Sequence, residues 1–378
     1  MNTRIATKAD INLIKNIWEN SGENSVFSKW FFDKIFYSDN AVITEEDNCP
    51  LACACTVGYT LDINKARLAA SYIVSMRANP ENRTANVLNT LAADTLSFIA
   101  GKGMPIAFTV PDNYKFFAKY GFSLCYDYMQ YDITSDDIPG YEVSSKVLRP
   151  ENFDSETVGM LNAIYEKFIA DKNGAALRTP ENWRYIADDL YHNFDGKCII
   201  LKNDKNEPIA YMFYILRDNK LGVYELCYTD KSAYEQMLGL IKAFSCDKIS
   251  LKVPSNDLFY MSLCDKRMAV TRCPFAMARI TNVKTILELF ADNAGEDIRL
   301  QVIDRVMEEN NKTFTFSQGS VITIETDSNV AIDIGTLTQL VLGYLSVDEA
   351  SSLNLIKGDA TRLKSLFKKQ TTYINMLN

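Results

Sequence analysis

Residues 72 to 122 constrain the fold of this chain more than any other stretch. Their pattern is typical of a strand, a helix over about 83 to 100, and a second strand. Gly101 and Gly103 follow the helix, at a position where glycine commonly ends one. A strand, a crossover helix and a second strand place two parallel strands side by side in one sheet. The stretch therefore predicts an α/β fold.

The residues before this stretch predict further elements of the same sheet. A helix is indicated by apolar side chains at helical spacing, namely Ile11, Ile14, Ile17 and Trp18. A second helix is predicted near residues 27 to 36. Alternating apolar residues predict strands over 41 to 45 and 50 to 62, separated by a polar turn.

A polar, turn-rich segment at residues 134 to 140 predicts a domain boundary. The order of strands and helices beyond it parallels that of the first region. The loop between Cys227 and Tyr234 lacks an Arg or Gln followed by Gly at the spacing expected of a phosphate-binding loop. We therefore interpret this second region as a degenerate copy without a cofactor site.

From residue 283 the pattern changes to a helix followed by short strands of alternating apolar residues. Thr336 is predicted to cap a later helix, and another helix is predicted over 360 to 367. The sequence thus predicts an α/β (α+β) chain of mixed sheets with flanking helices. Its predicted domains are 1–134, 145–282 and 283–378.

Composition narrows the classes of function. The 378 residues carry a formal net charge of -8 with a pI near 5.0, whereas nucleic-acid binders usually present a basic patch or stripe. We therefore expect no nucleic-acid partner. The nine cysteines are an odd number without paired CxxC spacing, which favours reduced thiols over a disulfide framework.

The N-terminus lacks the apolar core of a secretory signal. No apolar run approaches the roughly 18 residues that a membrane helix needs. Together with the reduced cysteines, these features predict a cytoplasmic protein without a membrane span.

The strand, loop and helix of residues 72 to 122 resemble the core of the GNAT superfamily of acyl-CoA N-acyltransferases. Over essentially the whole chain, the order of motifs resembles the enhanced-intracellular-survival (Eis) type, in which two GNAT domains precede a domain similar to sterol carrier proteins. The motifs are Ile17-Trp18, residues 40–47, Pro80-Glu81-Asn82-Arg83, Lys119-Tyr120-Gly121-Phe122, Met277-Ala278-Arg279-Ile280 and residues 333–340.

The resemblance implies acetyl transfer from acetyl-CoA to an amine of a small molecule, an aminoglycoside-like compound or a lysine, without a metal. A helix start concentrates unpaired N–H donors and positive potential, which suits a diphosphate. The residues that the resemblance assigns to the cofactor are Ser75, Met76, Ala78, Arg83, Thr84, Ala85, Asn86 and Val87. Asn86 replaces the family's usual glycine, so we expect weaker cofactor binding.

In the Eis type, the α-carboxylate of the last residue is the base and a tyrosine is the acid. The resemblance assigns the first role to Asn378, but Phe117 occupies the tyrosine position and cannot donate a proton. Tyr120, Tyr114 or water are the alternatives for the acid. The leading hypothesis is an N-acetyltransferase, assembled as a homo-oligomer like relatives of this layout. A catalytically impaired binding or scaffolding relative is the alternative, and a lipid-binding protein is a third.

Several of these residues also have a purely structural interpretation. Arg83 can be an ordinary solvated arginine at a helix start. The aromatic residues of the first two helices, Trp18, Trp30, Phe31 and Phe32, are expected to pack in the core rather than line a substrate cleft. His192 has no Cys or His partner at metal-ligand spacing, which favours a surface turn.

Overall fold

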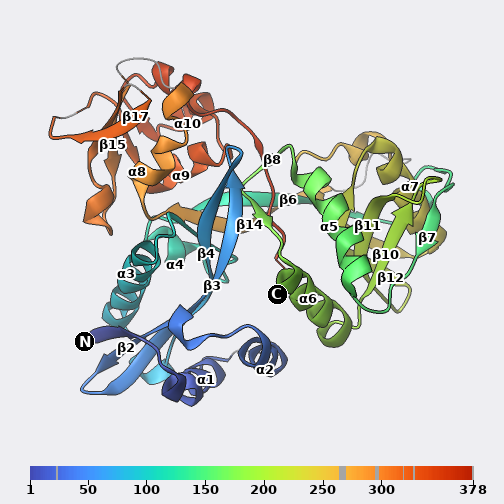
Figure 1. Ribbon diagram of the computed structural model, residues 1–378, viewed down its shortest axis with the longest axis horizontal. Coiled ribbons are helices and arrows are strands. Elements are labelled where there is room, and N and C mark those ends of the chain that lie inside the picture. Colours follow the sequence, from blue (N-terminus) through green and yellow to red (C-terminus); the bar gives the residue numbers. More distant parts are fainter. Residues whose placement is uncertain (23, 264–269, 294–297, 318, 327, 377–378) are drawn as a thin grey trace. The chain divides into compact units, whose positions relative to one another are not determined.

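The computed structural model describes the chain except for residues 23, 264–269, 294–297, 318, 327 and 377–378. The chain divides into two compact units (Figure 1). Unit 1 comprises Met1–Tyr126 and Phe275–Gln370, and unit 2 comprises Asp127–Pro274 and Thr371–Asn378. The described part contains no helix with the length and apolar character needed to cross a membrane.

The first sheet of unit 1 has the strand order β1-β2-β3-β4-β5-β14. Neighbours are antiparallel except β4 and β5, which are parallel and joined through helix α3. The predicted crossover is thereby confirmed. The elements are β1 (Asn2–Ile5), α1 (Ile11–Asn20), α2 (Ser25–Lys34), β2 (Ala41–Glu46), β3 (Cys49–Ile63), β4 (Ala66–Ala78), α3 (Ala85–Gly101), β5 (Ile106–Thr109), α4 (Tyr114–Ala118), β6 (Ser123–Ile133) and β14 (Val270–Ile280).

Helices cover both faces of this sheet, because alternate residues of a strand point to opposite sides. On one face, Ile43, Cys53 and Cys55 pack with α1 and α2. On the other face, Ala52 and Ala54 pack with α3. The predicted core packing is confirmed for Trp18, Phe31 and Phe32, which are buried, with the Trp18 ring stacked on Phe31. Trp30 is partly buried and packs against the same cluster.

A second sheet in unit 1 has the order β17-β16-β15-β18-β19. The predicted cap at Thr336 is wrong, because Asp333 is the N-cap and its carboxylate accepts a hydrogen bond from the Thr336 N–H at 3.0 Å. The helix predicted over 360 to 367 is a short 3-10 helix, Thr361–Ser365. The other elements are α8 (Val283–Glu288), β15 (Arg299–Ile303), β16 (Thr313–Ser317), β17 (Ser320–Ile324), β18 (Ala331–Asp333), α9 (Ile334–Val341), α10 (Val347–Ser352) and β19 (Ile356–Lys357).

Arg279 connects two of the sequence motifs of unit 1, residues 119–122 and 277–280. Arg279 is fully buried, forms an ion pair with Asp304 at 2.6 Å and donates a hydrogen bond to the Tyr120 carbonyl. Gly121 has a φ of +80°, and a Cβ there would meet the Arg279 guanidinium at 2.6 Å. Only glycine suits this position, because it combines left-handed backbone geometry with a close neighbour.

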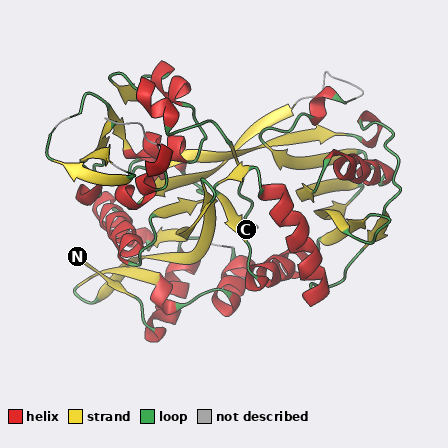
Figure 2. Cartoon of the chain, turned by 45° about the horizontal axis from the view of Figure 1, so that its top comes forward, coloured by secondary structure: helices red, strands yellow, loops and turns green. Residues whose placement is uncertain are grey.

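Unit 2 repeats the order of the first sheet. The antiparallel strands β10, β11 and β12 are followed by helix α7 and by β13, which pairs parallel with β12. Alternate residues again pack on opposite sides, Met212 and Leu226 with α7, and Tyr211 and Phe213 with the helix Ser155–Ile169. Figure 2 distinguishes the helices and strands of this unit by colour. The elements are β7 (Lys146–Leu148), α5 (Ser155–Ile169), β8 (Lys172–Asn173), β9 (Ala175–Leu177), α6 (Pro180–Asp188), β10 (Lys197–Lys202), β11 (Pro208–Arg217), β12 (Lys220–Tyr228), α7 (Lys231–Ala243) and β13 (Lys248–Pro254).

Two connecting segments pack within unit 2. Residues 134 to 140 are held by hydrogen bonds that include Lys242 Nζ to the Ile138 carbonyl at 2.5 Å. The C-terminal segment includes β20 (Thr371–Thr372), which pairs parallel with β8. The predicted fold class, mixed sheets with flanking helices, is confirmed. The described cysteines carry free thiols, while Cys264 lies outside the described residues.

Candidate functional site

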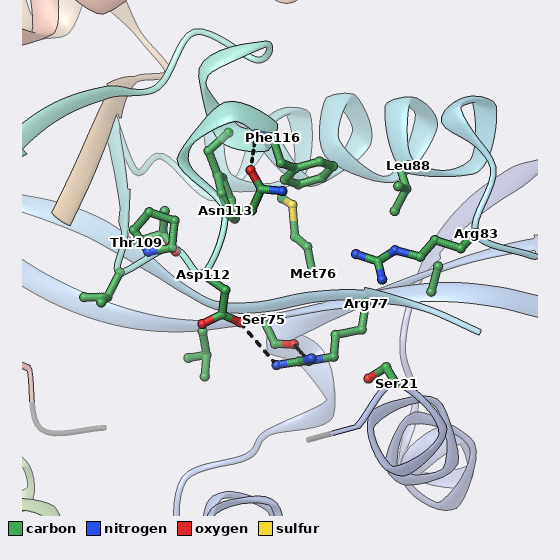
Figure 3. Close-up of a pocket in the computed structure, with 15 residues that line it drawn as sticks. Ser21, Ser75, Met76, Arg77, Arg83, Leu88, Thr109, Asp112, Asn113 and Phe116 are labelled. Carbon is green, nitrogen blue, oxygen red and sulfur yellow. Dashed lines mark hydrogen bonds and ion pairs between the residues drawn. The ribbon is translucent and has the colours of Figure 1, made fainter. Parts of the chain in front are cut away.

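A cavity of about 140 Å³ opens in unit 1 where two parallel strands separate. β4 and β5 pair only over Ala70–Tyr72 and Ile106–Phe108. Beyond these residues, the end of β4, the start of α3 and the segment after β5 surround the cavity (Figure 3). The lining residues are Ser21, Val74, Ser75, Met76, Arg77, Ala78, Arg83, Leu88, Thr109, Val110, Pro111, Asp112, Asn113, Phe116 and Phe117.

The end of β4 offers backbone groups to this cavity. The Asn79 N–H donates to the Leu51 carbonyl at 2.9 Å, so this pair belongs to the hydrogen-bonded set of the β3/β4 ladder. In an antiparallel ladder such pairs alternate along the strands. The N–H and C=O groups of Met76 and Ala78 therefore face away from β3, on the edge where the pairing with β5 has ended. An extended ligand can add its own hydrogen bonds there.

Two arginines give the cavity a positive character. Arg77 Nε donates to Ser75 Oγ at 3.1 Å, and its guanidinium lies 3.8 Å from the Asp112 carboxylate. The Asp112 side chain is 94% exposed, so this ion pair contributes little to holding the Arg77 guanidinium in place. Arg83 is exposed and extends from the loop before α3 into the cavity (Figure 3).

Among the described residues, Arg83 forms no hydrogen bond or ion pair. A guanidinium matches phosphate oxygens in two-point geometry, which makes both arginines suited to a diphosphate. Sequence reasoning found Arg83 but missed Arg77. The available signal was strand alternation, which places Arg77 on the same side of β4 as Ser75.

The first turn of α3 lies next to Arg83. Thr84 is the N-cap, and its Oγ1 accepts a hydrogen bond from the Val87 N–H at 3.3 Å. Asn86 is exposed and has no positive φ, so the backbone at this position does not require glycine. The structure brings Ser75, Met76, Ala78 and Arg83 together. In the described part of the chain, Thr84, Ala85, Asn86 and Val87 do not line the cavity.

The residues considered for acid catalysis lie at or near the same cavity. Phe117 lines it and is buried. The Tyr120 hydroxyl donates to Asn89 Oδ1 at 2.6 Å, and the Tyr114 hydroxyl donates to the Phe275 carbonyl at 2.9 Å. Burial raises the pKa of both phenols above the usual value. Neither tyrosine is among the residues that line the cavity in the described chain.

Asn378, the predicted base, lies outside the described residues. His192 is exposed in a one-turn π-helix of unit 2. Within the described residues, no group of three or more Asp, Glu, Cys or His side chains is arranged to hold a metal ion.

Comparison with known protein families assigns three segments of the chain. Residues 2–125 and 174–280 each match a GNAT acetyltransferase domain, and residues 283–375 match a sterol carrier protein domain. The chain therefore consists of GNAT acetyltransferase domains followed by a sterol carrier protein domain. This order of domains, two GNAT domains before a sterol carrier protein domain, confirms the layout on which the resemblance found in the sequence was based.

Solved structures with the same fold cover the whole chain. A conserved protein of unknown function from Enterococcus faecalis V583, described as a probable N-acyltransferase, has a TM-score of 0.86 at 18% identity, over 100% of this chain and 99% of that chain. Eis1 from Mycobacterium abscessus has a TM-score of 0.82 at 17% identity, with 100% of both chains covered.

A GCN5-related N-acetyltransferase from Anabaena variabilis ATCC 29413 also has a TM-score of 0.82, at 16% identity over 99% of this chain and 98% of that chain. At these identities the likeness establishes a shared fold. A comparison with curated proteins found no match.

Proposed function

We propose that this chain is an N-acetyltransferase that uses acetyl-CoA and transfers the acetyl group to a primary amine. This proposal rests mainly on the two arginines, Arg77 and Arg83, that line the cavity where β4 and β5 separate. In this proposal the two guanidinium groups and the first turn of α3 bind the cofactor diphosphate. The free backbone edge at Met76 and Ala78 binds the extended arm that ends in the thioester.

The reaction needs a proton acceptor and a proton donor. The amine nitrogen loses a proton to a base and attacks the thioester carbonyl, the C–S bond breaks, and the CoA thiolate takes up a proton. The α-carboxylate of Asn378 is the proposed base. Water is the proposed donor, because Phe117 has no acidic proton while the hydroxyls of Tyr120 and Tyr114 already donate to Asn89 and Phe275.

The arginine assignment is tested by titration calorimetry with CoA. The double variant Arg77→Gln, Arg83→Gln is expected to lose at least about 100-fold in affinity, because each charge-assisted hydrogen bond contributes roughly 1.5 to 3 kcal/mol. Arg67→Gln is a matched control, because this exposed arginine lies at the other end of the same strand. Unchanged CoA binding in the double variant, or absence of CoA binding to the parent, would refute the proposal.

The alternative is a relative that binds CoA without efficient turnover, and Phe117 in the cavity wall favours it. Release of free CoA thiol from acetyl-CoA with a panel of amines separates the two. An active parent supports the acetyltransferase. A silent parent that gains activity on Phe117→Tyr supports the impaired relative.

We further propose a cytoplasmic location, a homo-oligomeric assembly and catalysis without a metal. The amine acceptor is a small molecule, an aminoglycoside-like compound or a lysine side chain.

A further inference from the structure

Unit 2 contains a larger cavity at the position that corresponds to the cofactor cavity of unit 1. β12 and β13 pair in parallel over Lys220–Val223 and Lys248–Leu251. Beyond this pairing, a cavity of about 510 Å³ is surrounded by the end of β12, the start of α7 and the segment after β13. Its volume falls within the roughly 300 to 1,000 Å³ of small-molecule sites. The degenerate domain therefore retains a pocket with a different lining.

The start of α7 disfavours a diphosphate. Asp230 is the N-cap of this helix, and its carboxylate accepts a hydrogen bond from the Ala233 N–H at 2.9 Å. A negative charge thus already occupies the helix start, where an anionic ligand would otherwise bind. In unit 1 the corresponding cap is the neutral Thr84, preceded by Arg83. The second cavity has the opposite electrostatic preference at this point.

Two lysines line the second cavity, and carboxylates from the same lining neutralise both. Lys172 Nζ lies 2.8 Å from Asp171 Oδ1 and also donates to the Phe168 carbonyl at 2.5 Å. Lys231 pairs with Glu235 at 3.4 Å. The remaining lining carboxylates, Asp230 and Asp257, leave the cavity with an excess of negative charge.

Asp257 is a buried carboxylate whose orientation is fixed by three donors. Its Oδ1 accepts from the Tyr131 hydroxyl and the Phe259 N–H, each at 2.8 Å, and its Oδ2 accepts from the Tyr234 hydroxyl at 2.8 Å. Burial raises the pKa of this carboxyl. A cationic ligand nearby would offset the cost of keeping the carboxylate charged and buried.

An aromatic wall adjoins this carboxylate. The rings of Tyr228 and Tyr234 stack with centroids 4.5 Å apart and an interplanar angle of 18°. Leu258 and Met261, each 61% exposed, add apolar surface to the lining. These aromatic and apolar side chains line the cavity and can bind the hydrocarbon part of an organic cation.

We propose that the cavity of unit 2 binds an organic cation, namely an amine that carries an aromatic or apolar group. The ammonium lies near Asp257 and Asp230, and the apolar group packs on Tyr228, Tyr234, Leu258 and Met261. This site is separate from the CoA cavity. Its existence does not depend on the acetyltransferase proposal.

Titration calorimetry of the full chain with three probes of similar size tests the charge preference. The probes are phenethylamine, phenethyl alcohol and 3-phenylpropionate, which are cationic, neutral and anionic. We expect phenethylamine to bind with a Kd below about 1 mM, at least tenfold more tightly than the alcohol, and the anion not to bind. Equal affinity for amine and alcohol, or no binding of the amine, would overturn the proposal.

Variants locate the site. Asp230→Asn keeps a good helix cap while removing the charge, and Asp257→Asn keeps the shape of the side chain. Each is expected to weaken phenethylamine binding at least fivefold. Asp204→Asn is the matched control, because this aspartate is exposed in the turn between β10 and β11.

Binding to the other cavity has a distinct signature. If phenethylamine binds only in unit 1, both unit 2 variants leave its affinity unchanged, and the proposal fails. CoA titrations provide the converse measurement. The unit 2 variants should leave the CoA affinity unchanged, and a second CoA per chain that is sensitive to Asp230→Asn would also overturn the proposal.

Discussion

The two GNAT domains use arginine in opposite ways. Arg83 of unit 1 is exposed at a cavity and forms no ion pair within the described residues. Arg178 of unit 2 is 3% exposed and is bound to Glu225, which is fully buried, at 2.7 Å. The same fold thus makes one guanidinium available to a ligand and commits the other to the structure. Arginine content alone therefore does not identify a phosphate-binding GNAT domain.

The buried pair of unit 2 holds the described end of the chain. Glu225 accepts hydrogen bonds from Arg178, from Tyr211, from Tyr373 at 2.9 Å and from Asn375 at 3.1 Å. Burial opposes ionisation of Glu225, but the charge of Arg178 outweighs this effect and holds the pKa of Glu225 below its usual value. The network therefore keeps Glu225 charged and fixes residues 371 to 376 on unit 2.

The largest expected effect follows from removing the negative charge of this network. Glu225→Gln leaves the Arg178 guanidinium buried without its counter-charge, which should destabilise unit 2 by about 3 to 5 kcal/mol. Hydrogen exchange of the amides in β11 and β12 measures the loss. Arg83→Gln in unit 1 is the contrasting variant, and its stability should change by less than about 0.5 kcal/mol because the side chain is exposed. Similar stability losses in both variants would remove the contrast between the two arginines.

A lysine in the same network predicts a pH dependence for unit 2. Lys252 Nζ donates to Asn375 Oδ1 at 3.1 Å and lies 4.4 Å from the centre of the Tyr128 ring. Burial lowers the pKa of Lys252 from 10.5 to about 8. Below pH 8 the folded and unfolded states both carry the proton, and the folded state bears the full desolvation cost. Between pH 8 and 10.5 the folded state loses this proton while the unfolded state retains it, so stability rises with pH.

Comparison with Lys252→Met isolates this contribution from the tyrosines and cysteines that titrate at similar pH. As the pH rises from 7 to about 11, the parent should gain about 3 kcal/mol in unfolding free energy relative to the variant. Urea unfolding at several pH values measures the difference. If the difference in unfolding free energy between the parent and Lys252→Met does not change with pH, water solvates the Lys252 ammonium in the folded state.

The sequence predicted the parts of this structure that depend on local pattern. The crossover of residues 72 to 122 followed from the apolar pattern and from Gly101 and Gly103. The predicted N-cap of α9, Thr336, lies three residues after the observed one, Asp333. Both are good capping residues, and only the backbone geometry selects Asp333.

The candidate sites were harder to predict, because they depend on burial and on contacts between distant residues. Arg77 differs from Arg178 through its surroundings, which no local pattern encodes. The second cavity was missed because the expected signal was a phosphate-binding loop, whereas its lining selects against phosphate. Asn86 was expected to weaken cofactor binding, yet it is exposed and does not line the cavity of unit 1. Its effect on affinity stays a prediction.

The smallest expected effect comes from giving unit 1 the helix cap of unit 2. Thr84→Asp keeps a good N-cap for α3 but places a carboxylate at the helix start, as Asp230 does for α7. We expect CoA to bind about tenfold more weakly, a loss of about 1.4 kcal/mol, because the added charge repels the diphosphate. Calorimetry at low salt measures this loss, and higher ionic strength should reduce it through screening.

Thr84→Asn is the matched control for this substitution, because asparagine caps a helix equally well and adds no charge. Its CoA affinity should stay within about twofold of the parent. If the aspartate and asparagine variants bind CoA equally, the diphosphate does not lie near the first turn of α3. The charge at the two helix starts would then not explain why only the first domain is expected to bind the cofactor, and the difference would have to come from Arg77 and the free edge of β4.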